Sequence, residues 1–114
     1  MEKQSCCKEN TNAYSLIIAT TSDRESAKKI ARLLVEKRLA ACAQLLPIES
    51  VYRWKDEINE ENEIALFIKS RTALFEKVKT AIKENHAYEV PEIVQLPITD
   101  GLPEYLNWIG DCTM

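Results

Sequence analysis

Apolar residues recur along the chain with two different periods, and these periods predict its strands and helices. Residues 13–20 form a short apolar run that is rich in strand formers and predicts a buried strand. Ser22 and Glu25 then match a capping box, which predicts that a helix begins at Ser22. Apolar residues at spacings of three and four follow, as on one buried helix face: Ala27, Ile30, Ala31, Leu34 and Val35.

The middle of the chain predicts a long hairpin. Residues 41–54 and 58–70 are both extended in pattern, and residues 55–57 between them are typical of a turn. Pro47 marks a bend or an edge position in the first of these segments. A second helix is expected after residue 70 or 72, and Asn85 ends it.

The last part of the chain predicts a strand at 93–98 and a short helix that begins at Pro103. Two apolar stripes are expected to be buried on the second and third helices: Leu74, Phe75, Val78, Ala81 and Ile82, then Leu102, Tyr105, Leu106 and Ile109.

The predicted order is β-α-β-β-α-β with a terminal helix, which is the ferredoxin-like α+β plan. Two helices then cover one face of an antiparallel sheet and leave the other face bare. Each arm of the hairpin has about 13 residues and reaches roughly 40 Å, which exceeds the width of a 13 kDa domain. We therefore predict an obligate homo-oligomer in which the hairpins pack across subunits.

Size and charge narrow the possible functions. A chain of 114 residues predicts one domain at 13–112, and the polar residues 1–12 predict a disordered tail. The net charge of −3 disfavours nucleic acid as a partner, because phosphates require a basic surface. Neither a signal peptide nor a membrane span is expected from the sequence, so a cytoplasmic location is predicted.

The four cysteines are then expected to be reduced thiols. The neighbours Cys6 and Cys7 can hold a soft ion such as Cu(I), although only loosely if the tail is disordered.

Five segments resemble the CutA family of divalent-cation-tolerance proteins: VEKRLAACAQLLP (35–47), SVYRW (50–54), EIALFIKS (63–70), HAYEVPEIVQLPI (86–98) and YLNWI (105–109). The resemblance runs in order from about residue 14 to 110. It implies a ferredoxin-like homotrimer, similar in subunit plan to the PII signalling proteins and linked to tolerance of copper and other divalent metals. It does not imply an enzyme. The chain differs from some members at Ala19, where they carry a cysteine, and at Asn85, where they carry a second histidine.

Metal-binding candidates are His86 and Cys42, because copper and zinc prefer imidazole and thiolate ligands. No cofactor is required by this hypothesis, although copper or another divalent metal is a possible ligand. The structural alternatives are that His86 hydrogen-bonds locally after the second helix and that Cys42 is a small buried hydrophobe.

A subunit cleft is the second kind of candidate site, because clefts between subunits often bind small molecules. The residues expected in its wall are Lys69, Tyr52, Trp54, Tyr88, Glu89 and Glu92. For Lys69 the alternative is an ion pair or simple solvent exposure. For Trp54 and Tyr52 the alternative is that they pack in an interface between subunits and do not stack on a ligand.

Catalysis is disfavoured, because the sequence has neither a glycine-rich phosphate loop nor a paired histidine metal motif. Two hypotheses remain. The first is a trimeric, non-enzymatic metal-tolerance protein with a metal bound at a subunit interface. The second is a PII-like signalling trimer that binds a small anionic ligand.

Overall fold

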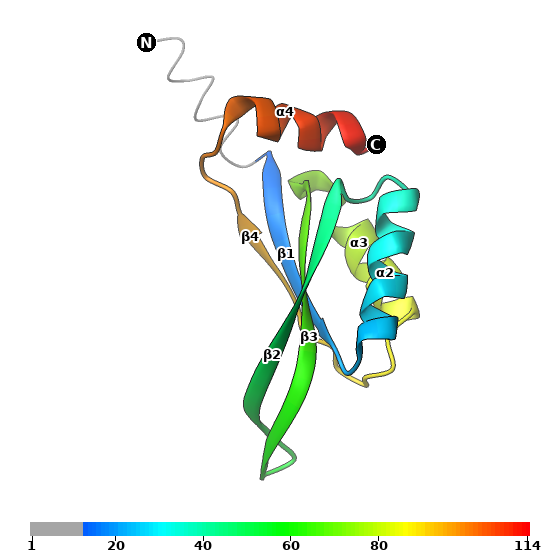
Figure 1. Ribbon diagram of the computed structural model, residues 1–114, viewed down its shortest axis with the longest axis vertical. Helices are drawn as coiled ribbons and strands as arrows, with labels where there is room; N and C mark the ends of the chain where they lie inside the picture. The colour runs from blue at the N-terminus through cyan, green and yellow to red at the C-terminus, as the bar shows by residue number, and fades with distance from the viewer. Residues whose placement is uncertain (1–12) are drawn as a thin grey trace.

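The structure is a computed structural model, and it describes residues 13–114 (Figure 1). The predicted tail, with Cys6 and Cys7, lies outside these residues. The elements follow in the predicted order: β1 (Tyr14–Thr21), α2 (Arg24–Glu36), β2 (Cys42–Trp54), β3 (Glu57–Arg71), η1 (Thr72–Leu74), α3 (Phe75–Glu84), β4 (Ile93–Pro97) and α4 (Pro103–Cys112).

All four strands belong to one antiparallel sheet with the order β2-β3-β1-β4. Helices α2 and α3 cover one face of this sheet, and α4 lies across the end where β1 begins (Figure 1). The prediction of an α+β fold is confirmed at this level. A single chain does not test the predicted assembly.

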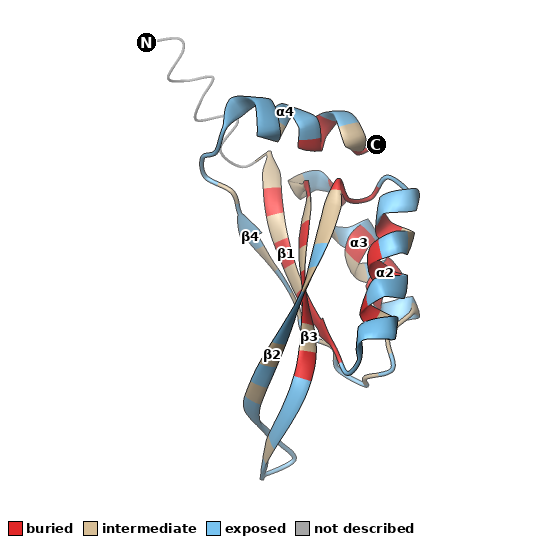
Figure 2. Cartoon of the chain, viewed as in Figure 1, coloured by how far each residue is buried: buried red, intermediate tan, exposed pale blue. Residues whose placement is uncertain are grey.

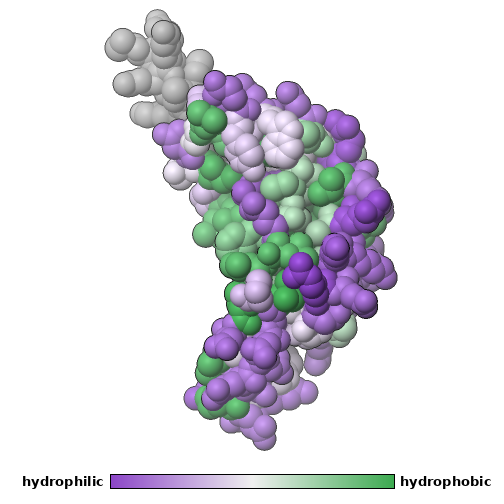
Figure 3. All heavy atoms as spheres, in the orientation of Figure 1, coloured by the Kyte–Doolittle hydropathy of each residue, from purple (hydrophilic) through white to green (hydrophobic). Residues whose placement is uncertain are grey.

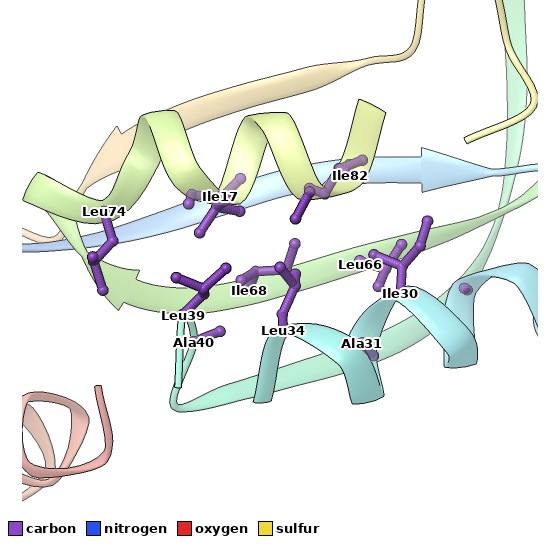
Figure 4. Close-up of a cluster of buried hydrophobic side chains, with 14 residues drawn as sticks. Ile17, Ile30, Ala31, Leu34, Leu39, Ala40, Leu66, Ile68, Leu74 and Ile82 are labelled. Carbon is purple, nitrogen blue, oxygen red and sulfur yellow. The ribbon is translucent and has the colours of Figure 1, made fainter. Parts of the chain in front are cut away.

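The hydrophobic core lies between the sheet and helices α2 and α3 (Figure 4). Ile17 of β1 and Leu66 and Ile68 of β3 are fully buried there, together with Leu34 of α2 and Ile82 of α3. Complete burial of such a side chain stabilises a fold by about 1.5–3 kcal/mol. This cluster is therefore the main source of stability in the single chain.

Helix α2 begins one residue later than the capping box predicted. Asp23, rather than Ser22, is the N-cap, and its carboxylate accepts hydrogen bonds from the backbone N–H (3.2 Å) and hydroxyl (2.7 Å) of Ser26. These bonds from Ser26 hold the pKa of Asp23 below its ordinary value. A carboxylate has an advantage over a hydroxyl at this position because it also interacts favourably with the helix dipole.

The other end of α2 closes with a residue in the left-handed conformation. Arg38 has φ of 59°, and the N–H of Leu39 reaches back to the carbonyl of Leu34 at 2.9 Å. This is the Schellman geometry that usually requires glycine. The Arg38 guanidinium also donates to the carbonyl of Asp111 at 2.9 Å, so the end of α2 is tied to α4.

Three residues that were expected to be buried are exposed. Val35 is 42% exposed because it lies at the border of the apolar stripe of α2. Leu102 and Tyr105 are exposed at the start of α4, whereas Ile109 on the same stripe is buried. The apolar pattern therefore identified the helix faces correctly, but this chain does not cover all of them.

The hairpin of β2 and β3 extends well beyond the rest of the sheet. Only residues 64–71 of β3 pair with β1, while pairing with β2 continues to Trp54 and Glu57. We call residues 48–63 the projecting arm. It makes the molecule 53 Å long but only 29 and 22 Å in its other dimensions. Figure 1 shows the arm below the body, and most of it is exposed in Figure 2.

The sheet face opposite the helices carries apolar side chains that no element of the described chain covers. Residues directly opposite in antiparallel strands share a face, which places these side chains together. We call this the bare face, and its apolar residues are Leu16, Ile18, Leu46, Phe67, Val94 and Leu96. Figure 3 shows apolar side chains along the flank away from the helices and across the waist above the arm.

Candidate functional site

His86 lies in the loop after α3, and both of its ring nitrogens are occupied. Nε2 is 2.6 Å from the carbonyl oxygen of Thr20, and Nδ1 accepts the backbone N–H of Tyr88 at 3.1 Å. A carbonyl can only accept, so the proton is on Nε2 and the ring is neutral. The side chain therefore fastens its loop to the end of β1. A metal ion would have to displace one of these two bonds.

Tyr88 follows in the same loop and reaches across to β3. Its hydroxyl donates to Glu63 at 2.9 Å, and its ring packs against His86 with a centroid separation of 4.7 Å. Burial is the main reason that the pKa of Tyr88 is raised, and the hydrogen bond and negative charge of Glu63 add to it. The phenol therefore stays protonated and remains a hydrogen-bond donor.

A second tyrosine–glutamate pair involves Glu61, which precedes Glu63 by two residues on β3. Tyr52 of β2 donates to Glu61 at 2.8 Å, and this bond raises the pKa of Tyr52. Glu61 and Glu63 are two residues apart on one strand, so both point to the same face of the sheet. The two tyrosines thus fix two neighbouring carboxylates in position.

These side chains line an open groove of about 710 Å³ between the arm and the loop after α3. We call it the acidic groove. Its lining consists of Thr20, Glu49, Ser50, Val51, Tyr52, Trp54, Glu61, Glu63, Tyr88, Glu89, Val90 and Glu92. Five of the six predicted cleft residues belong to it, namely Tyr52, Trp54, Tyr88, Glu89 and Glu92. A smaller hollow of 460 Å³ at the start of α2 shares Glu49 and Glu63 with the groove.

The acidic groove carries an excess of negative charge, and none of its glutamates forms an ion pair within the described residues. Within residues 13–114 the only ion pairs are Arg32–Glu36 and Lys79–Glu76, both on helices. The five glutamates of the groove thus have no basic partner in this part of the chain. Glu63 is the extreme case, because it is only 8% exposed and its one recorded hydrogen-bond partner is a neutral phenol.

Lys69 and Cys42 lie at the other end of the sheet, where they are directly opposite each other. The Lys69 amine donates to the side-chain oxygen of Gln44 at 3.0 Å and lies 5.4 Å from the centre of the Tyr105 ring. The sulfur of Cys42 is 3.8 Å from the hydroxyl of the same tyrosine. Neither residue belongs to the acidic groove.

His86 and Cys42 are consequently far apart in one chain. His86 contacts Thr20, which pairs with Ala65, and Cys42 pairs with Lys69, four residues further along β3. Four strand residues span about 13 Å. Among the described residues, no three histidine, cysteine or acidic side chains are arranged to hold a metal ion. A metal site that uses His86 or Cys42 therefore needs ligands from another subunit.

The sequence analysis missed three acidic residues of the groove: Glu49, Glu61 and Glu63. The signal was available for two of them. Glu61 and Glu63 share the strand period of Phe67 and Lys69, which places all four on the bare face. The contribution of Glu49 depends on how the arm curves, and the sequence pattern carries no such information.

No helix within residues 13–114 has the length and apolar character needed to cross a membrane. The two cysteines in this part of the chain, Cys42 and Cys112, are both free thiols.

Comparison with known proteins agrees with the geometry of the chain. The family model of the CutA1 divalent ion tolerance protein matches residues 15–112. The divalent-cation tolerance protein CutA of Thermus thermophilus is 44% identical over 99 residues, which are 86% of this chain and 96% of that protein. The chloroplastic protein CutA of Arabidopsis thaliana is 40% identical over 86% of this chain, but this chain spans only 54% of its length.

Solved structures show the same fold. The crystal structure of CutA from Xylella fastidiosa has a TM-score of 0.87 at 39% identity and covers 90% of this chain and 99% of its own. The Thermus thermophilus structure has a TM-score of 0.86 at 43% identity, with 89% and 99% coverage. The family match spans almost every described residue, and the chain belongs to the CutA1 family of divalent ion tolerance proteins.

Proposed function

We propose that this protein confers tolerance to divalent cations as a homotrimer that binds the cation at a boundary between subunits. The observation that carries this proposal is the acidic groove, which offers five carboxylates and has no basic partner in the described chain. Carboxylate oxygens are ligands for divalent cations, and a concentrated negative field raises the local cation concentration. The family to which the chain belongs supports this direction.

The proposed assembly rests on surface that one chain cannot cover. Val51 and Ile58 on the projecting arm are 69% and 60% exposed, and the apolar bare face has no covering layer among the described residues. Large exposed apolar areas mark interaction surfaces. A second and a third copy of the chain would cover both regions. Ligands from two subunits would also supply the third donor that the described part of a single chain lacks.

Copper remains the metal that His86 and Cys42 would favour, whereas the groove itself offers only oxygen ligands. The occupied ring of His86 supports a positioning role for this residue. The same acidic lining repels an anion, so the geometry gives no support to the anion-binding alternative.

We also propose that the protein acts without catalysis. The distance between Cys42 and His86 leaves no cysteine–histidine nucleophile among the described residues of one chain. The free thiols of Cys42 and Cys112 fit a reducing compartment such as the cytoplasm.

Native mass spectrometry with titrated Mn(II), Zn(II) and Cu(II) tests this function. The full-length C6S/C7S variant is the reference, because the tail thiols would bind copper by themselves. We expect a trimer that takes up a whole number of ions. E89Q/E92Q should weaken the uptake about tenfold or more, equal to about 1.4 kcal/mol. The control E84Q/E104Q removes two exposed carboxylates outside the groove and should change nothing.

His86→Ala separates the two possible metal sites. If the groove carboxylates hold the ion, this variant keeps most of its Mn(II) affinity. If instead H86A abolishes Cu(II) uptake while E89Q/E92Q has no effect, the metal is held by imidazole and the proposed groove site is wrong. A monomeric reference protein would contradict the proposed assembly.

A further inference from the structure

The bare face has opposite charge at its two ends. Glu61 and Glu63 lie towards the arm, on the same sheet face as Lys69 at the far end. Between them are the apolar residues of the bare face, including Phe67 and Leu46. One end of the face is thus acidic, the middle is apolar and the other end is basic. Such a surface is complementary to itself when two copies meet head to tail.

Glu63 forms no ion pair within the described part of its own chain, although Arg24 lines the smaller hollow beside it. Glu63 is only 8% exposed as a residue, and a nearby cation stabilises a carboxylate in such surroundings. Lys69 is on the same strand face but six residues away, which corresponds to about 20 Å. No lysine side chain spans that distance, so Lys69 and Glu63 of one chain do not pair.

Lys69 likewise forms no ion pair within the described part of the chain. The residue is half-buried, and its exposed amine is bonded to the neutral amide of Gln44 and lies 5.4 Å from the centre of the Tyr105 ring. No carboxylate of the described chain lies within 4 Å of this amine. Two charges of opposite sign therefore lie without an ionic partner on the same face, and a second copy would bring them together.

We propose that Lys69 of one subunit enters the acidic groove of the next subunit and pairs with Glu63 beside Tyr88. The inference rests on the proposed homotrimer, to which it adds the direction of contact. In the proposed homotrimer the contact is heterologous: the basic end of one subunit meets the acidic end of the next, and three such contacts close a ring. The hydroxyl of Tyr88 already occupies one oxygen of Glu63 and leaves the other for the amine.

This pairing divides the acidic groove into two parts. The inner carboxylate of Glu63 becomes structural, because it is neutralised by a lysine that arrives with the neighbouring subunit. The other four carboxylates of the groove, Glu49, Glu61, Glu89 and Glu92, stay negative and available for a divalent cation.

A double-mutant cycle on trimer dissociation tests the pair. The variants are K69M, E63Q and K69M/E63Q, and sedimentation velocity over a dilution series measures the concentration at which half of the trimer has dissociated. Each single variant should raise that concentration on the order of 30-fold or more, because it leaves a buried charge without a partner. The double variant should be no weaker than either single variant. K77M, on the exposed face of α3, is the matched control and should leave assembly unchanged.

The charge exchange K69E/E63K provides a second, more demanding test. We expect both single exchanges to dissociate the trimer and the double exchange to restore it. Circular dichroism of each dissociated variant must show folded subunits. If the lysine side chain of E63K unfolds the chain, E63Q is used in its place.

Four outcomes overturn the inference, and each points to a different error. If K69M leaves the trimer intact while E63Q weakens it, the occupant of the groove is a free cation. If the losses from K69M and E63Q simply add, the two residues do not contact each other. A wild-type monomer contradicts the proposed homotrimer itself, whereas a wild-type trimer that ignores both substitutions contradicts only this pair.

Discussion

The two halves of the β2–β3 hairpin share one continuous backbone ladder but have opposite surroundings. In the supported half, residues 42–47 and 64–71, one face packs against the core and contains Leu66 and Ile68. In the projecting arm, residues 48–63, most side chains are exposed (Figure 2), and the loop after α3 covers only the end at Glu63. Two strands can thus stay hydrogen-bonded to each other beyond the hydrophobic core, but such a hairpin is stable only where its side chains are packed. The half that contributes least to the fold contains most of the candidate site.

The largest expected effect comes from removing buried volume in the supported half. Leu66→Ala leaves a cavity beneath α2 and α3 and should lower the free energy of unfolding by about 2–5 kcal/mol. The matched substitution in the arm is Val51→Ala, which removes an exposed side chain. Urea denaturation at two protein concentrations measures both. L66A should be destabilised equally at both, and a concentration-dependent loss for V51A would show that another subunit covers the arm.

Tyr88→Phe gives an intermediate effect at the junction of the two halves. At neutral pH the lost bond to the Glu63 carboxylate should cost about 1.5 kcal/mol.

The pH dependence of this effect has a definite sign. The pKa of Tyr88 is raised by folding, whereas an unfolded tyrosine ionises near pH 10. The stabilisation is therefore complete below about pH 10 and is lost as the pH rises towards the folded pKa. Unfolding curves from pH 8 to 11 should show a steeper decline for wild type than for Y88F. Y52F is the control, since its phenol is exposed and its effect should be smaller. Parallel declines in wild type and Y88F would contradict the role of burial.

The smallest expected effect compares two residues in the left-handed conformation. Asp56 at the tip of the arm has φ of 67°, and Arg38 beside the core has φ of 59°. Asp56→Gly relieves the strain without losing a contact that the structure records, so it should stabilise the chain by about 0.5–1 kcal/mol. Arg38→Gly relieves similar strain but loses the bond to Asp111, so little net gain is expected. Thermal unfolding of both variants checks this, and equal gains would show that the Arg38 contact contributes nothing.

The sequence predicted the supported part of the molecule well because its elements depend on local rules. Burial of one side gives β1, α2 and β3 their periodic patterns of apolar residues, and the structure has these elements close to the predicted positions. Errors arose where two local residues competed. Ser22 and Asp23 both can cap α2, and the charged one is used.

The candidate site was harder to predict because it is built by curvature and long-range contact. The five cleft residues in the groove come from a strand and a loop that are more than thirty residues apart, and only the folded chain brings them together. Lys69 was grouped with them by chemistry, yet its position on the strand places it at the opposite end of the sheet. Side-chain type indicated which residues suit a cleft, whereas only register showed which of them meet.

The long hairpin also affects the order in which the protein folds. Pairing within the hairpin begins between residues that are close in sequence, such as Trp54 and Glu57. Pairing of β1 with β3 joins residues that are far apart in sequence, such as Tyr14 and Arg71. Local hairpins form within microseconds, and pairing across long loops is slower because of loop-closure entropy. We expect the hairpin to form and break transiently on each newly made chain before the core beneath it is complete. Its unpaired strand edges are then exposed before the core closes, so a slow-folding chain is open to premature edge-to-edge association.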